Sequence, residues 1–220
     1  MAFFIPKFME FIADEIDSYS LNHTEAEAEL LAELNRETWA NVMTPRMLSG
    51  HLQGRVLSMF SKMINPKNII EVGTYTGYSA LCMAEGLKNE GILHTLDINE
   101  EYTSIAKRYF NRSKYSKNIK QHLGNALDII PKLECNFQLA FIDADKENYS
   151  AYFDLIIDKM DLYGYIIADN VLWSGKVTKE KKDKETTALD LYNKKVLADP
   201  RVETVLLPIR DGLMVSRKIK

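Results

Sequence analysis

The chain has 220 residues, of which 46% are apolar and 27% are charged, and its formal net charge is −3. This length and apolar content suffice for one folded domain and exclude a disordered chain. The weak negative charge argues against nucleic acid and membrane surfaces as partners, because both attract a concentrated excess of lysine and arginine. We therefore predict a single domain over residues 1–220.

The N-terminal segment has the pattern of a helix with one apolar face. Lys7, Glu10 and Asp14 interrupt its apolar run, which is too short to cross a bilayer and does not match a signal peptide. The apolar residues on the predicted face are Phe4, Phe8, Phe11, Ile12 and Ile16.

Two further helices are predicted before the first strand. Thr24 and Glu27 have the spacing of a capping box, so we expect a helix over residues 25–40. Apolar residues then recur at helical spacing from Leu52 to Ile64, and Asn65-Pro66 ends this helix. Residues 1–66 therefore form a predicted helical N-terminal section.

Beyond this section, short apolar runs alternate with longer amphipathic stretches, which is typical of strands and helices around a parallel sheet. The seven predicted strands cover residues 68–72, 91–98, 118–123, 137–143, 165–169, 202–208 and 213–218. The last two are joined through Arg210-Asp211-Gly212, which leaves no room for a crossover helix, so we expect an antiparallel hairpin at one end of the sheet. Residues 67–220 are therefore predicted to form a doubly wound α/β core with a seven-stranded, mostly parallel sheet.

The charged run from Lys176 to Glu185 is expected to be a solvated loop or the start of a helix, with a mobile lid as the alternative. Cys82 and Cys135 have no metal or redox spacing, so we expect two core residues in a reducing cytoplasm. No pairing that suggests metal binding or a catalytic triad is evident among the histidines, which are His23, His51, His94 and His122.

Acidic residues lie in or at the ends of four predicted strands, where ligands of doubly wound sheets collect. These residues are Glu71, Asp97, Asp143 and Asp169. Each one alone could be a helix cap or a salt-bridge partner, but four on one rim favour a binding site.

The first strand leads into a glycine-bearing turn, Glu71 to Ser79, that matches neither a dinucleotide-binding nor a phosphate-binding loop. Gly73 and Gly77 permit a ligand to approach the backbone closely, and the Glu71 carboxylate would repel phosphate but attract an ammonium group. Asp97 could accept the hydroxyls of a ribose, or it could cap the helix that follows. A nucleoside with a cationic amino acid group describes S-adenosylmethionine.

The densest acidic cluster is Asp143-Ala144-Asp145-Lys146, together with Asp169-Asn170 after the next strand. Adjacent parallel strands lie roughly 5 Å apart, so these side chains could converge. Carboxylate and amide oxygens suit Mg²⁺, or Mn²⁺ or Ca²⁺, rather than zinc. The alternative is that Asp143 and Asp145 pair with Lys146 and nearby bases.

The motifs EVGTYTGYSA, LDIN, GNAL, FIDADKENY, DNVLWSG and DGLMVSRK together resemble the class I metal-dependent O-methyltransferases of the caffeoyl-coenzyme A and catechol type. The resemblance, which begins near Met47, implies the fold of S-adenosylmethionine methyltransferases. The cofactor positions that it implies are Met47, Ser49, Glu71, Gly73, Thr74, Ser79, Asp97, Ala126, Asp143 and Asp145. The implied metal ligands are Asp143, Asp169 and Asn170.

The resemblance also implies transfer of a methyl group from a sulfonium to an aryl oxygen of a phenolic small molecule, with Lys146 as the general base. A salt bridge from Lys146 to Asp145 is the alternative role. Trp173 could form a wall beside a planar acceptor or belong to the core. Ser174 stands where the plant enzymes have an asparagine, so the acceptor contact there is open.

The family further suggests a homodimer, for which the apolar N-terminal helix could provide an interface. Three rivals stay open: a nucleic-acid methyltransferase, a nicotinamide-dependent oxidoreductase and a binding protein without catalysis. The first would usually show an Asn- or Asp-Pro-Pro-aromatic motif and a basic face, and this sequence has neither.

Overall fold

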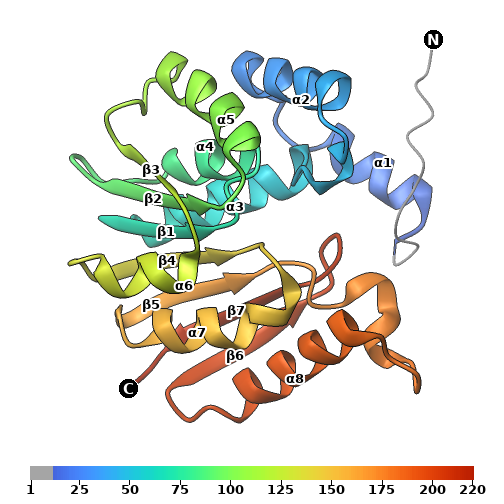
Figure 1. Cartoon of the computed structure of the whole chain (residues 1–220). Helices are drawn as coiled ribbons and strands as arrows, with labels where there is room; N and C mark the ends of the chain where they lie inside the picture. The colour runs from blue at the N-terminus through green and yellow to red at the C-terminus, as the bar shows by residue number, and fades with distance from the viewer. Residues whose placement is uncertain (1–11) are drawn as a thin grey trace.

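A computed structural model describes residues 12–220, and its seven strands form one sheet in the order β3-β2-β1-β4-β5-β7-β6 (Figure 1). The strands are β1 Asn68–Val72, β2 Ile92–Asp97, β3 Ile119–Leu123, β4 Phe137–Ile142, β5 Met160–Ala168, β6 Val202–Leu207 and β7 Leu213–Lys218. Strand β7 pairs antiparallel with both β5 and β6, and all other neighbours are parallel. The predicted mostly parallel sheet with an antiparallel C-terminal hairpin is confirmed.

Helices cover both faces of the sheet, with α3, α4 and α5 on one face and α6, α7 and α8 on the other (Figure 1). The helices are α1 Asp14–Asn22, α2 Glu29–Asn41, α3 His51–Ile64, α4 Tyr78–Ala84, α5 Glu100–Arg112, α6 Ala126–Ile129, α7 Tyr149–Ile157 and α8 Lys184–Ala198. Short 3₁₀ turns occupy Pro45–Met47, Ile130–Lys132, Lys146–Asn148 and Trp173–Thr178. Among the described helices, none has the length and apolar character that a membrane crossing requires.

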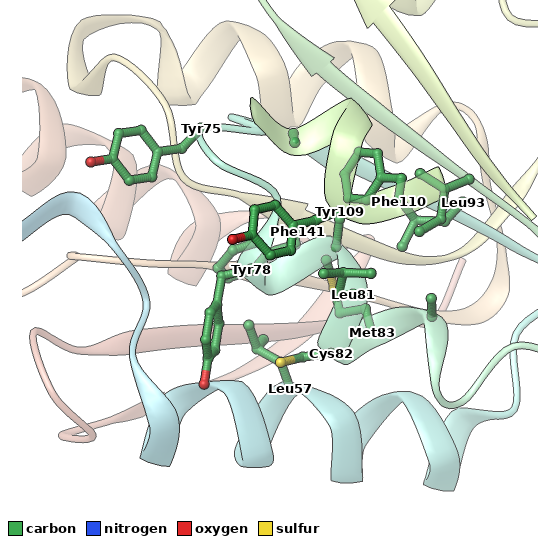
Figure 2. Close-up of a cluster of buried hydrophobic side chains, with 14 of the residues drawn as sticks. Leu57, Tyr75, Tyr78, Leu81, Cys82, Met83, Leu93, Tyr109, Phe110 and Phe141 are labelled. Atoms are coloured by element: carbon green, nitrogen blue, oxygen red, sulfur yellow. The ribbon is translucent and has the colours of Figure 1, made fainter. Parts of the chain in front are cut away.

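Each face of the sheet has its own apolar core. On the first face, Tyr78 and Cys82 of α4 face Leu57 of α3 (Figure 2). A Cβ at Gly54 of α3 would lie 2.7 Å from the Tyr78 ring, so the glycine lets α3 and α4 approach closely. On the second face, Phe153 of α7 packs against Tyr192 of α8 with their rings 6.3 Å apart. These two cores pack against the sheet from its two faces.

The N-terminal helices differ from their prediction. Helix α2 begins at Glu29 rather than at residue 25, and its N-cap, Ala28, has no capping side chain. The predicted capping box is wrong because the Thr24 hydroxyl donates back to Ser20 O, at 2.7 Å, at the end of α1. The end of α3 is confirmed: Asn65 closes it in a left-handed conformation, with φ of +51°.

Only part of the predicted N-terminal helix face can be compared with the structure. Phe4, Phe8 and Phe11 lie outside the described residues. Ile12 precedes α1, and Ile16 lies within it with 59% of its surface exposed. Ile16 therefore does not pack into a core of the described chain.

Three local predictions are settled by the structure. Strand β5 begins at Met160 rather than at residue 165, because a break at Tyr163, whose φ is +67°, hides its first half from the apolar pattern. The charged run does lead into a helix, since Asp183 accepts from Thr186 N at 2.8 Å and caps α8. Cys82 is a core residue, but Cys135 is only half-buried, which corrects the expectation for the second cysteine.

Candidate active site

The carboxyl ends of β1, β2, β4 and β5 form one rim of the sheet. The strand register places Val72 opposite both Leu96 and Ile142, and Ile142 opposite Ala168. Residues that end or follow these strands must therefore lie at the same edge. This rim holds the four acidic positions that the sequence singled out.

The turn between β1 and α4 touches the end of β4. Gly73 has φ of +104°, and a Cβ there would lie 1.9 Å from the carbonyl oxygen of Asp143. Gly77 has φ of +91°, and the Phe110 ring leaves only 2.7 Å for a Cβ. Because no side chain fits at residue 73, glycine is what allows the predicted cofactor turn to lie against the predicted metal ligands.

Glu71 is a fully buried carboxylate at this turn. Its two oxygens accept hydrogen bonds from Ser79 Oγ and Thr95 Oγ1, each at 2.5 Å. Burial raises the pKa of Glu71 to about 8, although the two hydroxyl donors oppose this rise. Within residues 12–220 no cationic side chain pairs with it. The site thus fits a ligand that brings its own ammonium group.

Asp97 ties the rim together through backbone donors. Its Oδ2 accepts from Tyr75 N at 2.7 Å, and its Oδ1 accepts from Asn99 N at 2.9 Å. Asn99 in turn accepts from Glu101 N at 2.9 Å and caps α5, so Asp97 supports the start of that helix indirectly. Each carboxylate oxygen keeps a lone pair that can accept a ribose hydroxyl, and the two expected roles are therefore compatible.

The other predicted cofactor residues surround this turn. Tyr75 Oη donates to Thr44 O at 2.9 Å, which brings the segment with the half-exposed Met47 and the buried Ser49 beside it. The Thr74 and Thr95 hydroxyls lie 2.6 Å apart, so the Thr74 side chain points toward β2.

Ala126 and Asp145 lie at neighbouring parts of the rim. Gly124 N donates to Asp97 O at 2.8 Å, which positions the buried Ala126 at the start of α6 near the end of β2. Asp145 is exposed, and it accepts from Asn148 and from Tyr152. The alternative salt bridge between Lys146 and Asp145 is wrong, because Lys146 pairs with Asp143 instead, at 3.0 Å.

The three predicted metal ligands lie at the ends of β4 and β5. Asp169 is completely buried, whereas Asp143 and Asn170 are partly exposed. Burial and the charge of Asp143 raise the pKa of Asp169, and Arg210 and Gln53 oppose the rise, so that the pKa is about 6. Two carboxylates therefore interact electrostatically across the strand ends.

Lys146 marks the point on which two of these side chains converge. Its Nζ donates to Asp143 Oδ1 at 3.0 Å, to Asn170 Oδ1 at 2.8 Å and to Tyr149 Oη at 2.7 Å. All three ammonium protons are thus satisfied, and the oxygens surround a positive centre. The pairing of Asp143 with Lys146 that was left open is present, and Tyr149 completes it.

The donor set fits a hard divalent cation. Asp143, Asp169 and Asn170 supply only oxygen atoms, and two of the three already hold the Lys146 ammonium. Among residues 12–220, no group of three or more His, Cys, Asp and Glu side chains that could hold a metal ion is found, and the third predicted ligand here is an amide. The set excludes a thiolate or imidazole zinc site of the usual kind.

Trp173 and Ser174 lie in a strained loop beside this cluster. Trp173, Ser174 and Gly175 all have positive φ, of +47°, +53° and +73°. Asp211 stabilises this conformation by accepting from Ser174 N at 2.6 Å. The Trp173 ring lies 5.6 Å from Lys146 Nζ and packs against the second core, so its core role is confirmed and its role beside an acceptor stays a prediction.

Two histidines pair in a way that the sequence analysis missed. His94 Nδ1 and His122 Nε2 lie 3.0 Å apart, and their rings stack on neighbouring strands. Burial, together with the charges of His122 and Lys120, lowers the pKa of His94 to about 4. Among the described residues the pair includes no third group typical of a metal site or a catalytic triad, and it lies away from the rim residues described above.

Three residues near the cluster were not predicted. Gln53 donates to Asp169 Oδ2 at 2.7 Å, and Arg210 donates to Gln53 Oε1 at 3.1 Å. Tyr149 is the last residue of the quoted motif FIDADKENY and lies three residues after Lys146, so it could have been found. Gln53 and Arg210 carried no such signal, since each contacts the cluster from a distant part of the chain.

Known proteins are similar to this chain both in sequence and in structure. A family model described as O-methyltransferase matches residues 20–219. A caffeoyl-CoA O-methyltransferase of Mesembryanthemum crystallinum is 36% identical over 180 residues, covering 76% of this chain and 71% of the relative. Another from Petroselinum crispum is 34% identical over 206 residues, covering 88% of this chain and 85% of the relative.

Among solved structures, the SAH-bound methyltransferase of Podospora anserina superposes with a TM-score of 0.88. It is 27% identical, and the superposition covers 98% of this chain and 99% of that one. The sheet order, the turn after β1 and the acidic rim define a methyltransferase of the α/β class. The chain belongs to the O-methyltransferase family.

Proposed function

We propose that this enzyme transfers a methyl group from S-adenosylmethionine to one hydroxyl of a vicinal diphenol, of the catechol, caffeoyl or flavonoid type, with a divalent cation bound at the rim. The observation that carries the proposal is the convergence of Asp143 and Asn170 oxygens on Lys146, directly beside the Gly73 turn. Cofactor, cation and acceptor would then meet at one edge of the sheet.

The cofactor part of the proposal rests on the buried carboxylate and the turn. Glu71 would bind the ammonium group, and Asp97 would accept the ribose hydroxyls through its remaining lone pairs. Ser49, Thr74, Ser79, Ala126 and the Met47 side chain surround the same region. The SAH-bound relative from Podospora anserina supports this assignment.

The chemical part assigns separate tasks to the rim residues. A cation bound by Asp143, Asp169 and Asn170 would act as a Lewis acid on the acceptor oxygens. Once Asp143 and Asn170 are engaged as ligands, Lys146 would keep only Tyr149 as a hydrogen-bond partner. Lys146 would then take the proton from the attacking hydroxyl.

The acceptor would lie against Trp173. The Nζ atoms of Lys146 and Lys176 lie 5.6 and 5.7 Å from the centre of the Trp173 ring. A planar phenol could therefore pack beside this ring within reach of the base. Ser174 follows it in the same loop and would contact the acceptor by its hydroxyl. The names of the plant relatives support a caffeoyl acceptor, which is one member of the proposed class.

Chelation tests the metal part of this proposal. The protein is freed of divalent ions, and methylation of catechol, caffeate, a caffeoyl thioester and a flavonoid is followed by mass spectrometry with and without added Mg²⁺. We expect transfer only with Mg²⁺, while S-adenosylmethionine still binds to the chelated protein in a calorimetric titration. Full activity after chelation would disprove the metal role, and metal and cofactor binding without any methylated product would favour a binding protein.

We also propose that the chain forms a homodimer through its N-terminal region. Met59 and Met63 lie one turn apart on α3 with 59% and 75% of their surfaces exposed, and such an apolar face suits a subunit interface. Multi-angle light scattering should give twice the chain mass. The double variant Met59→Glu and Met63→Glu should give the mass of a monomer, and dimeric behaviour of that variant would exclude this face.

A further inference from the structure

The buried carboxylate of Asp169 is oriented by two polar contacts. Its Oδ1 accepts from the backbone N of Asn170 at 2.7 Å, and its Oδ2 accepts from Gln53 Nε2 at 2.7 Å. Gln53 belongs to the first turn of α3, so this contact joins the N-terminal section to the end of β5. The rotation of the carboxylate is therefore set from outside the sheet.

The Gln53 amide has only one satisfactory orientation. It is 1% exposed, and it lies between a carboxylate, which can only accept, and a guanidinium, which can only donate. Its Oε1 accepts from Arg210 Nη1 at 3.1 Å, so its NH₂ group must face Asp169. An exchange of the amide oxygen and nitrogen would lose both hydrogen bonds.

The two terminal nitrogens of the Arg210 guanidinium donate to different parts of the chain. While Nη1 reaches Gln53, Nη2 donates to Leu48 O at 2.8 Å and to Arg46 O at 3.3 Å. Nη1 also lies 3.7 Å from Asp169 Oδ2. One side chain in the turn between β6 and β7 thus contacts the Arg46–Leu48 segment and the buried carboxylate network together.

We infer that Gln53 and Arg210 are positioning residues that orient Asp169 and couple it to the segment of Met47 and Ser49, so that cofactor and cation strengthen each other's binding. This inference rests on the proposed function, because it takes Asp169 as a cation ligand and Met47 and Ser49 as cofactor contacts. A network that served stability alone would not need to connect Asp169 to the segment of Met47 and Ser49.

The physical basis is that each ligand would order the part of the network that the other needs. A cofactor that fixes Met47 and Ser49 also fixes the carbonyl oxygens of Arg46 and Leu48, to which Arg210 is bonded. This holds the guanidinium, and through it the Gln53 amide, in the orientation that directs the remaining Asp169 lone pairs. Linkage requires that the cation tighten cofactor binding by the same factor.

The first measurement is Mn²⁺ affinity by electron paramagnetic resonance, in the absence and presence of S-adenosylhomocysteine. Gln53→Met keeps the length of the side chain but removes both hydrogen bonds. We expect it to weaken Mn²⁺ binding about 10- to 100-fold, as loss of a group that orients a metal ligand usually does. The matched control is Gln121→Met, since Gln121 donates to Thr103 O at 2.8 Å on a different part of the sheet. It should bind Mn²⁺ like the wild type.

The second measurement is the coupling factor, the ratio of Mn²⁺ affinities with and without S-adenosylhomocysteine. Arg210→Lys keeps the charge, but one ammonium cannot span both Gln53 and Leu48 as the guanidinium does. This partly exposed position also tests the network without emptying buried space around Gln53. We expect the coupling factor to fall close to one, whereas Arg217→Lys, in the exposed ion pair with Glu203, should keep it.

The outcomes separate this inference from the proposed function. A wild type that binds Mn²⁺, with a Gln53→Met variant that binds it equally tightly, overturns the inference alone. An unchanged coupling factor in Arg210→Lys does the same. A wild type that binds no divalent cation overturns the metal role in the proposed function and this inference with it.

Discussion

At the scale of single residues, the rim is distinguished by buried carboxylates whose charge is at most partly compensated. Glu71 is buried with two hydroxyl donors and no cation among the described residues, and Asp169 is buried beside the charge of Asp143, with the Arg210 guanidinium 3.7 Å away. Burial of an uncompensated carboxylate is unfavourable, so such residues persist where a ligand supplies the missing charge. The two carboxylates differ in what could supply it, an ammonium at Glu71 and a metal cation at Asp169.

The pKa of Glu71 predicts a pH dependence of cofactor binding. Burial raises this pKa to about 8, so the side chain must lose a proton before it can bind an ammonium at neutral pH. We expect affinity for S-adenosylmethionine to rise from pH 6 toward pH 8, with proton release measurable by calorimetry in buffers of different ionisation enthalpy. Glu71→Gln should bind weakly without this slope, and the exposed Glu101→Gln should behave as the wild type.

The same pKa makes a prediction about stability without cofactor. Between the ordinary value of 4.5 and about 8, folded Glu71 keeps a proton that the unfolded chain has lost. The free energy of unfolding therefore falls as pH rises through this window. Denaturation by urea at several pH values should show a smaller fall for Glu71→Gln than for the wild type. Parallel curves would contradict the assignment of this proton to Glu71.

A substitution of Lys146 should lower turnover much more than it changes cofactor affinity. Lys146→Ala removes the proposed base but none of the proposed cofactor contacts, so turnover should fall about 100- to 10,000-fold, the usual range for loss of a general base. Cofactor affinity should change little by comparison. Lys159→Ala is a suitable control, because Lys159 donates to Leu133 O at the opposite end of the strands. Turnover of Lys146→Ala close to the wild type would remove Lys146 from the mechanism.

At the scale of elements, the site depends on how closely two strand ends approach. Strands β1 and β4 pair from Ile69 to Val72, and Gly73 then lies against the Asp143 carbonyl. The turn proposed to bind the cofactor and the loop proposed to bind the metal thus share a contact that has no room for a side chain. Any change that separates these strand ends should affect both binding sites together.

Gly73→Ala tests this shared contact. A Cβ 1.9 Å from a backbone oxygen forces the strand ends apart, and the positive φ adds strain. We expect loss of both cofactor and Mn²⁺ binding and a clearly lower melting temperature. Gly50→Ala is the matched control, since Gly50 also has positive φ, of +78°, but nothing lies within 4 Å of a Cβ there. Equal effects of the two substitutions would mean that backbone strain alone is responsible.

The elements differ in how well the sequence predicts them, and the reasons are local. Strand β1 was predicted with its observed limits because four of its five residues are buried and its neighbours are polar. The start of α2 was missed because Thr24 bonds backward to Ser20 rather than forward. The first half of β5 was missed because exposed residues and the left-handed Tyr163 interrupt its pattern.

The candidate site was predictable where it follows from strand ends. Asp97, Asp143 and Asp169 end or follow parallel strands, and such residues must share a rim. Gln53 and Arg210 were not predictable, because their bonds join residues 116 and 157 positions apart in the sequence. Contacts of that kind depend on how α3 and the β6–β7 turn pack onto the sheet, which no local pattern encodes.

At the scale of the whole molecule, the two faces of the sheet respond differently to acid. The face with α6, α7 and α8 lies beside the stacked pair of His94 and His122, whose pKa values are both lowered, mainly by burial. A buried neutral histidine must be charged or the structure must open when the pH falls. This part of the sheet should therefore limit stability in acid.

His94 provides a direct test of that limit. Its folded pKa of about 4 lies below the ordinary 6.5, so its contribution to stability is present above pH 6.5 and is lost as the pH falls toward 4. The free energy of unfolding of the wild type should decrease over this range more steeply than that of His94→Gln. The exposed His23→Gln should follow the wild type. A slope unaffected by His94→Gln would assign acid sensitivity to other groups.

The position of β7 has a consequence for how the protein is made. β7 follows β6 in the chain, yet it lies between β5 and β6 in the sheet. While the nascent chain emerges from the ribosome, β5 is synthesised long before β7, which must lie beside it. Until then the edge of β5 stays open to other chains. Asp169 directly follows β5, whereas Arg210 comes just before β7, so an unfinished chain has an open sheet edge and lacks the Arg210 contact with the acidic rim. We therefore expect methyl-transfer competence to arise late in synthesis, after a period in which a chaperone on the β5 edge would prevent aggregation.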